Sequence, residues 1–149
     1  MRTLERPAVT TVGYEGRTAG ELVDLVQRSG VTLLVDVRLT PLSRKPGLSK
    51  TKLAEALRGA GIEYLHLPTL GNPRDNREGY RQAEASALAR FRSLMRGAAA
   101  RHALDDLATR IGDESVALLC FERDHATCHR SLVIEALQQR TDELTVHHI

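Results

Sequence analysis

Short apolar runs alternate with helical segments along the whole chain, and this alternation limits the folds that the sequence can adopt. Five runs favour strands: "VTTVGY", "VTLLVDV", "IEYLHL", "SVALLCF" and "ELTVHHI". Segments with helical spacing of apolar residues lie between them, at 18–30, 49–61, 80–95, 99–111 and 131–140. Strands and helices in this order require crossover connections, which produce a mostly parallel sheet. We therefore predict one three-layer α/β domain over residues 1–149, with about five strands and helices on both faces.

Local signals place the boundaries of several elements. Thr18 is a candidate N-cap for the first helix and Gly30 a candidate stop, while the second helix begins near Ser49. The run "VTLLVDV" is continuously apolar, as expected of a strand buried on both faces. The segment "PTLGNPRDNREG", residues 68–79, is polar and rich in turn formers, which predicts a long loop.

Charge and cysteine content restrict the classes of function. The chain has 21 basic and 19 acidic residues, and a net charge of +2 is too small for wholesale binding to a polyanion. The basic residues are concentrated locally, because residues 38–52 contain five of them and no acid. The two cysteines cannot form a disulfide framework, and in a reducing compartment we expect a thiol or ligand role rather than a bridge.

No signal-peptide core is visible at the N-terminus, and no apolar run approaches the roughly 20 residues that span a bilayer. We therefore expect a cytoplasmic protein without membrane contact.

Polar residues follow the apolar runs, and ligands of open parallel sheets bind outside the carboxyl ends of the strands. After the first run, "GYEGRT" supplies Tyr14 and Arg17 in a turn where glycines permit close backbone approach. After the second run, Asp36 is a candidate acid, base or partner of a neighbouring arginine. The stiff, basic segment "LTPLSRKPGLSK" that follows favours an anionic ligand, with a solvated basic surface as the alternative. After the third run, His66 is a secondary candidate, more typical of a paired core histidine.

The segment "LLCFERDHATCHRS" admits three interpretations. Cys128 could be a nucleophile, since a helix N-terminus, His129 and Arg130 all favour its thiolate. Alternatively, two thiolates and two imidazoles could bind zinc, although the spacing matches no standard zinc motif. That set would consist of Cys120, His125, Cys128 and His129. In the third interpretation the cysteines are structural, and Glu122 is the candidate general base.

The pieces "TVGYEGRT", "LLVDVRLTPLSRKPGLSK", "GIEYLHLPTLGNP" and "LLCFERDHATCHRS" together resemble the bacterial and archaeal family catalogued as domain of unknown function 488. The resemblance implies a compact α/β domain and no particular reaction, and Leu48 stands where the family often has Phe. The positions matching the family's motif are Tyr14, Asp36, Arg38, Ser43, Arg44, Pro46, Glu122, Cys128, His129 and Arg130. A weaker similarity links "LLVDVR" to rhodanese-type sulfurtransferases, but the segment from Cys120 to Arg130 fits their anion-cradling loop poorly.

From these observations we predict a site that binds a phosphate-bearing small molecule or a nucleic-acid end. The site would belong to a hydrolase or transferase. Its predicted catalytic residues are Glu122, Cys128, His129 and Asp36, and its predicted ligand-binding residues are Tyr14, Arg17, Arg38, Ser43, Arg44 and Arg130. Arg38, Arg44 and Arg130 would clamp the anion. We expect no cofactor and assign no residue to a metal. The alternatives are a non-catalytic nucleic-acid-binding module and a thiol-dependent sulfur-transfer or redox protein.

Overall fold

Five parallel strands form the centre of the protein in a computed structural model that describes residues 7–149. Their spatial order is β3-β2-β4-β1-β5. The strands are β1 (Ala8–Gly13), β2 (Leu33–Asp36), β3 (Glu63–His66), β4 (Val116–Cys120) and β5 (Thr145–His148). The predicted α/β class and the five strands are confirmed. Residues 1–6, which include most of the segment examined for a signal peptide, lie outside the described part of the chain.

Helices connect the strands and cover the sheet. The α-helices are α1 (Ala19–Arg28), α2 (Lys50–Gly59), α3 (Arg77–Arg81), α4 (Ala85–Met95), α5 (Ala98–Asp113) and α6 (Arg130–Gln138). Short 3-10 helices are η1 (Pro68–Leu70), η2 (Arg74–Asn76) and η3 (His125–Thr127). None of the described helices is long and apolar enough to cross a membrane.

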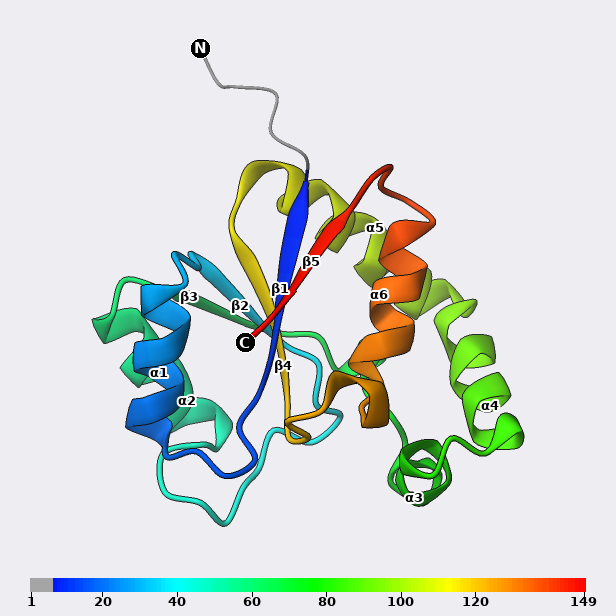
Figure 1. Ribbon diagram of the computed structural model, residues 1–149, viewed down its shortest axis with the longest axis horizontal. Helices are drawn as coiled ribbons and strands as arrows, with labels where there is room; N and C mark the ends of the chain where they lie inside the picture. The colour runs from blue at the N-terminus through cyan, green and yellow to red at the C-terminus, as the bar shows by residue number, and fades with distance from the viewer. Residues whose placement is uncertain (1–6) are drawn as a thin grey trace.

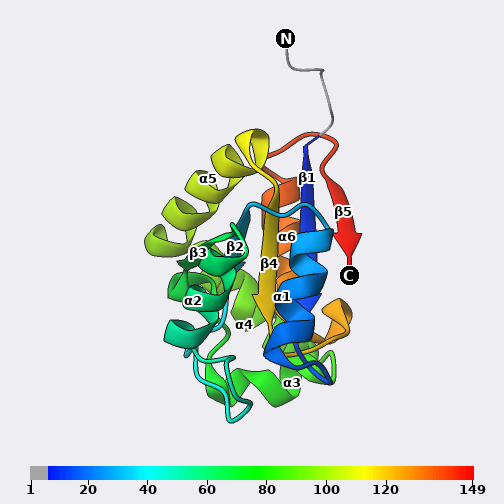
Figure 2. The same ribbon diagram turned by 90° about the vertical axis from the view of Figure 1, so that its left-hand side faces the viewer.

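The helices lie in two layers, with α1 and α2 on one face of the sheet and α4, α5 and α6 on the other (Figures 1 and 2). On the first face, Leu22 of α1 and Leu53 of α2 pack with Leu34 of β2. On the second, Leu33 and Val35 of β2 join the side chains of the longer helices. Strand β2 is therefore buried on both faces, as its continuous apolar run predicts.

Two sequence expectations about the middle of the chain need correction. The single helix predicted over 80–95 is two helices, because the helix is interrupted between α3 and α4 at Ala83, whose φ of 57° is incompatible with a continuous right-handed helix. The segment predicted as a loop over 68–79 is also not irregular throughout, since it contains η1, η2 and the beginning of α3. The turn formers are present, but they join short helical turns.

The capping of α1 fixes where the segment after β1 ends and the helix begins. Thr18 Oγ1 accepts a hydrogen bond from the Glu21 amide at 3.1 Å, and the Glu21 carboxylate accepts one from the Thr18 amide at 2.9 Å. Such a capping box stabilises a helix by about 1 kcal/mol. The predicted Thr18 cap is therefore confirmed.

Strands β1 and β4 are neighbours, but the chain leaves them toward opposite faces. Strand β1 leads to α1 in one layer, whereas β4 leads through η3 to α6 in the other layer (Figure 1). Divergence of this kind opens a crevice outside the carboxyl ends of the two strands. The fold therefore places the ends of β1 and β4 where a ligand site is expected.

Candidate functional site

A cavity of about 190 Å³ lies outside the carboxyl ends of β1, β2 and β4. Its wall combines residues from the three strand ends with residues from the segment around α3. The lining consists of Tyr14, Arg38, Leu39, Thr40, Leu42, Asn72, Arg77, Arg81, Cys120, Phe121, Glu122, Thr127 and His129. Four residues predicted for the site, Tyr14, Arg38, Glu122 and His129, are thus brought together.

Asp36 and Arg38 form a buried ion pair beneath this wall. Asp36 Oδ1 accepts from Arg38 Nε at 2.9 Å, and Oδ2 accepts from the terminal guanidinium nitrogen at 2.7 Å. Tyr64 donates its hydroxyl to the same Oδ2 at 2.5 Å. Burial alone would lower the pKa of Arg38, but hydrogen bonds and charge from Asp36 outweigh it and raise that pKa. Arg38 therefore stays charged, and Asp36 anchors it from below.

Arg38 has further partners that hold its backbone and side chain in place. Its second terminal nitrogen donates to the Leu48 carbonyl at 2.7 Å and lies 3.5 Å from the Tyr14 hydroxyl. The carbonyl of Arg38 accepts from His66 Nε2 at 2.7 Å. His66 thus orients the strand end that carries Arg38.

His129 is buried against the same strand end. Its Nε2 lies 2.7 Å from the Val37 carbonyl, and because a carbonyl oxygen can only accept, Nε2 carries the proton. Burial, reinforced by the charge of Arg130, outweighs the Val37 hydrogen bond and lowers the pKa of His129 to about 4. At neutral pH the ring is uncharged, with an unprotonated Nδ1 that lies 3.6 Å from Cys128 Sγ.

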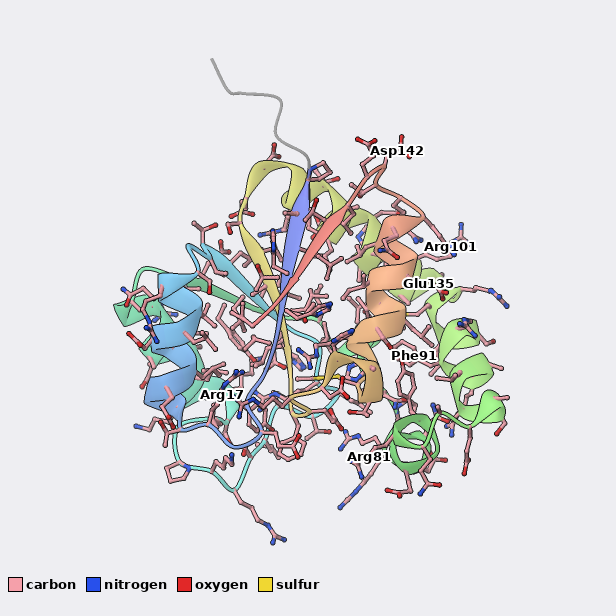
Figure 3. The ribbon with its side chains drawn as sticks, in the orientation of Figure 1. Arg17, Arg81, Phe91, Arg101, Glu135 and Asp142 are labelled. Atoms are coloured by element: carbon pink, nitrogen blue, oxygen red, sulfur yellow. A yellow bond between two sulfur atoms is a disulfide. The ribbon has the colours of Figure 1, made fainter. Side chains whose placement is uncertain are left out.

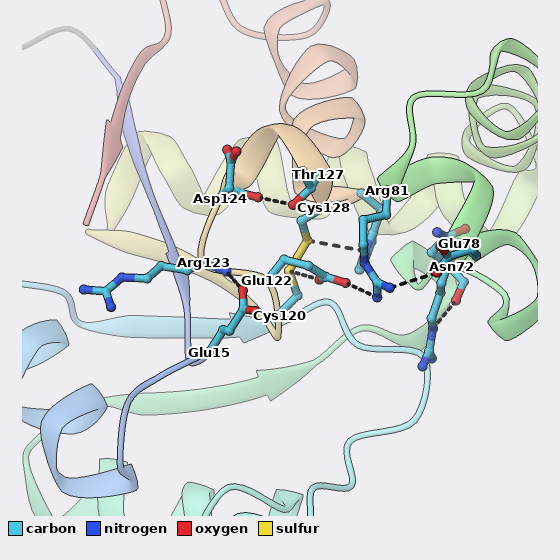
Figure 4. Close-up of polar contacts among 12 residues, drawn as sticks. Glu15, Asn72, Glu78, Arg81, Cys120, Glu122, Arg123, Asp124, Thr127 and Cys128 are labelled. Atoms are coloured by element: carbon cyan, nitrogen blue, oxygen red, sulfur yellow. Dashed lines mark hydrogen bonds and ion pairs between the residues drawn. A yellow bond between two sulfur atoms is a disulfide. The ribbon is translucent and has the colours of Figure 1, made fainter.

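The two cysteines form a disulfide, so the expectation of a thiol or ligand role rather than a bridge is wrong for this structure. The bridge joins the end of β4 to the residue that precedes His129, and both cysteines are buried (Figure 4). The bridge was not predicted because a reducing compartment was expected, and because a sequence separation of 8 does not indicate that the sulfurs meet in the fold. The nucleophilic role of Cys128 stays a prediction that applies only to the reduced protein. His125 stacks on His148, with ring centroids 3.5 Å apart, instead of joining the sulfurs.

Glu122 contributes the carboxylate of the cavity. One of its oxygens lies 3.5 Å from a terminal nitrogen of Arg81, and the other lies 3.6 Å from Cys120 Sγ. Arg81 also pairs with Glu78 at 3.0 Å (Figure 4). The Glu122 side chain is 16% exposed, so it is accessible from the cavity, while Arg81 holds one of its oxygens.

Arg77 and Arg81 are site residues that the sequence prediction missed. Both come from the region predicted to be a loop followed by an ordinary helix. Arg77 donates weakly to the Asn72 carbonyl at 3.4 Å. The signal that could have revealed them is the spacing of Arg74, Arg77 and Arg81, because residues three and four apart share one side of a helical segment.

Arg17 and Arg130 lie apart from the cavity lining. Arg17 donates to the carbonyls of Gly13 at 2.7 Å and Ile149 at 3.4 Å. Figure 3 shows Arg17 and Arg81 on opposite sides of the strand ends. Arg130 is buried, donates to the Glu122 carbonyl, and its Nε has no hydrogen-bond partner in the described part of the chain. Burial lowers the pKa of Arg130 to about 10.

A second hollow of about 480 Å³ adjoins the cavity. It contains the predicted residues Ser43 and Arg44. Its lining consists of Leu39, Thr40, Leu42, Ser43, Arg44, Ser49, Arg74 and Arg77, four of which also line the cavity. Ser49 Oγ accepts from the Ser43 amide at 3.0 Å, which closes the basic loop on itself. The three residues of the predicted clamp therefore occupy different places: Arg38 in the cavity wall, Arg44 in the second hollow, and Arg130 outside both linings.

Comparison with known proteins gives one match. The family model described as "Domain of unknown function DUF488" matches residues 18–137. No curated protein and no solved structure matches the chain.

Proposed function

The chain belongs to the family of domains of unknown function DUF488, and since this description assigns no reaction, we propose a function from the site itself: binding of a phosphate-bearing ligand at the carboxyl edge of the sheet. One observation carries the proposal. The cavity and the adjoining hollow are lined by five arginines and a single carboxylate, that of Glu122. The arginines are Arg38, Arg44, Arg74, Arg77 and Arg81.

The positive charge in these hollows exceeds what the protein itself neutralises. Arg38 is balanced by Asp36, and Arg81 is shared between Glu78 and Glu122. Among residues 7–149, Arg77 donates only to a backbone carbonyl, and Arg44 is exposed beside it in the second hollow. A guanidinium presents paired donors that match phosphate oxygens, and such charge-assisted bonds are stronger than neutral ones. We therefore place the phosphate near Arg77, between Arg81 and Arg44.

An aromatic edge beside the arginines favours a nucleotide or nucleic-acid end within this ligand class. Phe121 lines the cavity and is 40% exposed, although large apolar side chains are usually buried. Its ring packs edge-on against Tyr14, with centroids 5.3 Å apart, which leaves a ring face for stacking. Stacking of a base on an aromatic side chain contributes about 1 to 3 kcal/mol.

The chemistry available beside the phosphate is proton transfer. Glu122 is a partly exposed carboxylate at the cavity wall, and His129 is an uncharged imidazole that also lines it. A carboxylate near a bound phosphate can accept a proton from an attacking hydroxyl or water. We propose a hydrolase or transferase in which Glu122 is the base, and Asp36 is a positioning residue through Arg38.

Binding is tested by calorimetry with a short 5′-phosphorylated oligonucleotide and its unphosphorylated counterpart. We expect Arg77→Ala and Arg81→Ala each to weaken binding of the phosphorylated probe by about 10- to 100-fold, because a hydrogen bond to a charged group contributes about 1.5 to 3 kcal/mol. Arg92→Ala is the matched control, since Arg92 lies outside both hollows and pairs with Glu135. Equal affinity of wild type and Arg77→Ala, or of the two probes, contradicts the proposal.

The same basic hollows also support a non-catalytic nucleic-acid-binding module. That function predicts a steep fall of affinity with salt and full tolerance of Glu122→Gln and Cys128→Ser. If Glu122→Gln still binds the probe but has lost turnover, the result favours an enzyme over a non-catalytic binding module.

The disulfide at the cavity wall favours the thiol-dependent alternative as a third candidate. It requires that Cys128 in the reduced protein react with an alkylating agent at a pH well below the usual thiol pKa of about 8.5. Slow alkylation at neutral pH argues against it.

A further inference from the structure

Three potential metal ligands converge behind the cavity wall. Cys120, Cys128 and His129 have ligand atoms that all lie within 4.8 Å of one another, and within the described residues this is the one group of three such side chains that close together. All three side chains are buried. Sulfur and imidazole nitrogen are the ligands that zinc prefers in proteins.

The distances around the sulfurs match those of a tetrahedral zinc site. Zinc bonds of about 2.3 Å to sulfur and 2.0–2.1 Å to nitrogen or oxygen place neighbouring ligand atoms about 3.6 Å apart. Cys128 Sγ lies 3.6 Å from His129 Nδ1, and Cys120 Sγ lies 3.6 Å from a Glu122 oxygen. The two sulfurs are closer than this, because they are bonded to each other.

The backbone already leaves room for the sulfurs to separate. The Cα atoms of the two cysteines are 7.4 Å apart, wider than the roughly 4.4–6.8 Å that disulfides usually span. Once the bond is reduced, rotation of the side chains brings the sulfurs to the spacing of about 3.8 Å that a tetrahedral ion requires.

His129 is held in the form that a metal ligand requires. Its Nε2–H donates to the Val37 carbonyl, so that Nδ1 presents a lone pair toward the sulfurs. Metal-binding histidines usually donate their other ring N–H to a carbonyl or carboxylate in this way. The Arg130 amide, 3.5 Å from Cys128 Sγ, is placed to donate to a thiolate.

We propose that the reduced protein binds one zinc ion through Cys120 Sγ, Cys128 Sγ and His129 Nδ1, with the Glu122 carboxylate turning in from beside Cys120 as the fourth ligand. A thiol or phosphine reductant supplies two electrons to the disulfide and is itself oxidised, and the two thiols lose two protons as zinc binds. Two thiolates, a neutral imidazole, the Glu122 carboxylate and Zn²⁺ carry one negative charge, which lies beside the Arg81 guanidinium that pairs with Glu122. This site differs from the zinc set considered from the sequence, because Glu122 takes the place of His125.

The test uses the full-length protein reduced with a phosphine and titrated with Co²⁺, whose tetrahedral thiolate complexes absorb in the visible and near ultraviolet. We expect one Co²⁺ per chain with thiolate-to-metal charge transfer, displaced by Zn²⁺. Cys128→Ser should weaken binding by more than the roughly 100-fold that loss of an outer-shell partner can cost. His125→Ala is the matched control and should bind as wild type does, since His125 stacks on His148.

The oxidised wild-type protein is a second control that requires no substitution. Its sulfurs are blocked, so it should show no charge-transfer band, whatever the effect of Cys128→Ser on folding. Absence of stoichiometric Co²⁺ binding to the reduced protein overturns the proposal, as does equal binding by the oxidised protein. The readout is independent of anion binding, so failure of the zinc site and failure of the phosphate site are separate results.

Discussion

The buried His129 makes a quantitative prediction about how stability depends on pH. In the oxidised protein its pKa is lowered to about 4 by burial and by the charges of Arg130 and Arg77, against opposing contributions from the Val37 carbonyl and Asp36. In the unfolded chain the same imidazole has a pKa of about 6.5. Between these values the unfolded state binds a proton that the folded state does not bind, so the free energy of unfolding falls as pH falls.

The magnitude follows from the separation of the two pKa values. At about 1.4 kcal/mol per pH unit, the contribution lost between neutral pH and pH 4.5 is about 2 to 3 kcal/mol. The assay is urea unfolding of the oxidised protein, followed by circular dichroism across this range. Carboxylates also titrate there, so the informative quantity is the difference between wild type and His129→Gln, whose amide can still donate to the Val37 carbonyl.

We expect the wild type to lose about 2 to 3 kcal/mol more than His129→Gln between neutral pH and pH 4.5. The matched comparison is His102→Gln, because His102 is exposed on α5 and its replacement should leave the pH dependence as it is in wild type. Parallel curves for wild type and His129→Gln would refute the reasoning, since they would mean that the buried ring takes up its proton as readily as the unfolded chain does.

Two substitutions test the scaffold of the site. Asp36→Ala leaves a buried guanidinium without its carboxylate and should lower the free energy of unfolding by about 3 to 5 kcal/mol, whereas Asp24→Ala removes an exposed pair and should cost less than about 1 kcal/mol. A similar cost for both would contradict the assigned importance of the buried pair. Gly13→Ala places a Cβ 1.9 Å from the Glu122 carbonyl oxygen, and such overpacking should cost about 1 to 3 kcal/mol and weaken phosphate binding by shifting the cavity wall. Gly59→Ala, with nothing within 4 Å, is the control, and calorimetry that finds both variants binding like wild type would disprove the expected shift.

Local patterns were sufficient to predict most of the fold. A continuous apolar run identifies β2 because only a strand covered on both faces can bury every residue from Leu33 to Val35. The Thr18 cap was predictable because it depends on residues three apart in the chain. The break between α3 and α4 at Ala83 was not predictable, because Ala83 has a positive φ although alanine is the strongest helix former.

The site was only partly predictable because its residues meet through long-range contacts. Tyr14, Arg38 and Glu122 could be placed together, since each follows a strand and parallel strands end at one edge. No such rule gives the position of α3, so the pairing of Arg81 with Glu122 could not be derived from the sequence. The meeting of the two cysteine sulfurs could not be derived from the sequence either.

The charge of the cysteine pair links the two proposals made for this site. A disulfide beside a neutral His129 has no net charge, and neither has a zinc ion with two thiolates and the same imidazole. With Glu122 as the fourth ligand the ion has no open position toward the cavity. Reduction and zinc loading should therefore change phosphate affinity by less than about threefold, or about 0.7 kcal/mol. Tenfold tighter binding to the zinc-loaded protein would show that phosphate reaches the ion itself, and that Glu122 yields its place to the ligand.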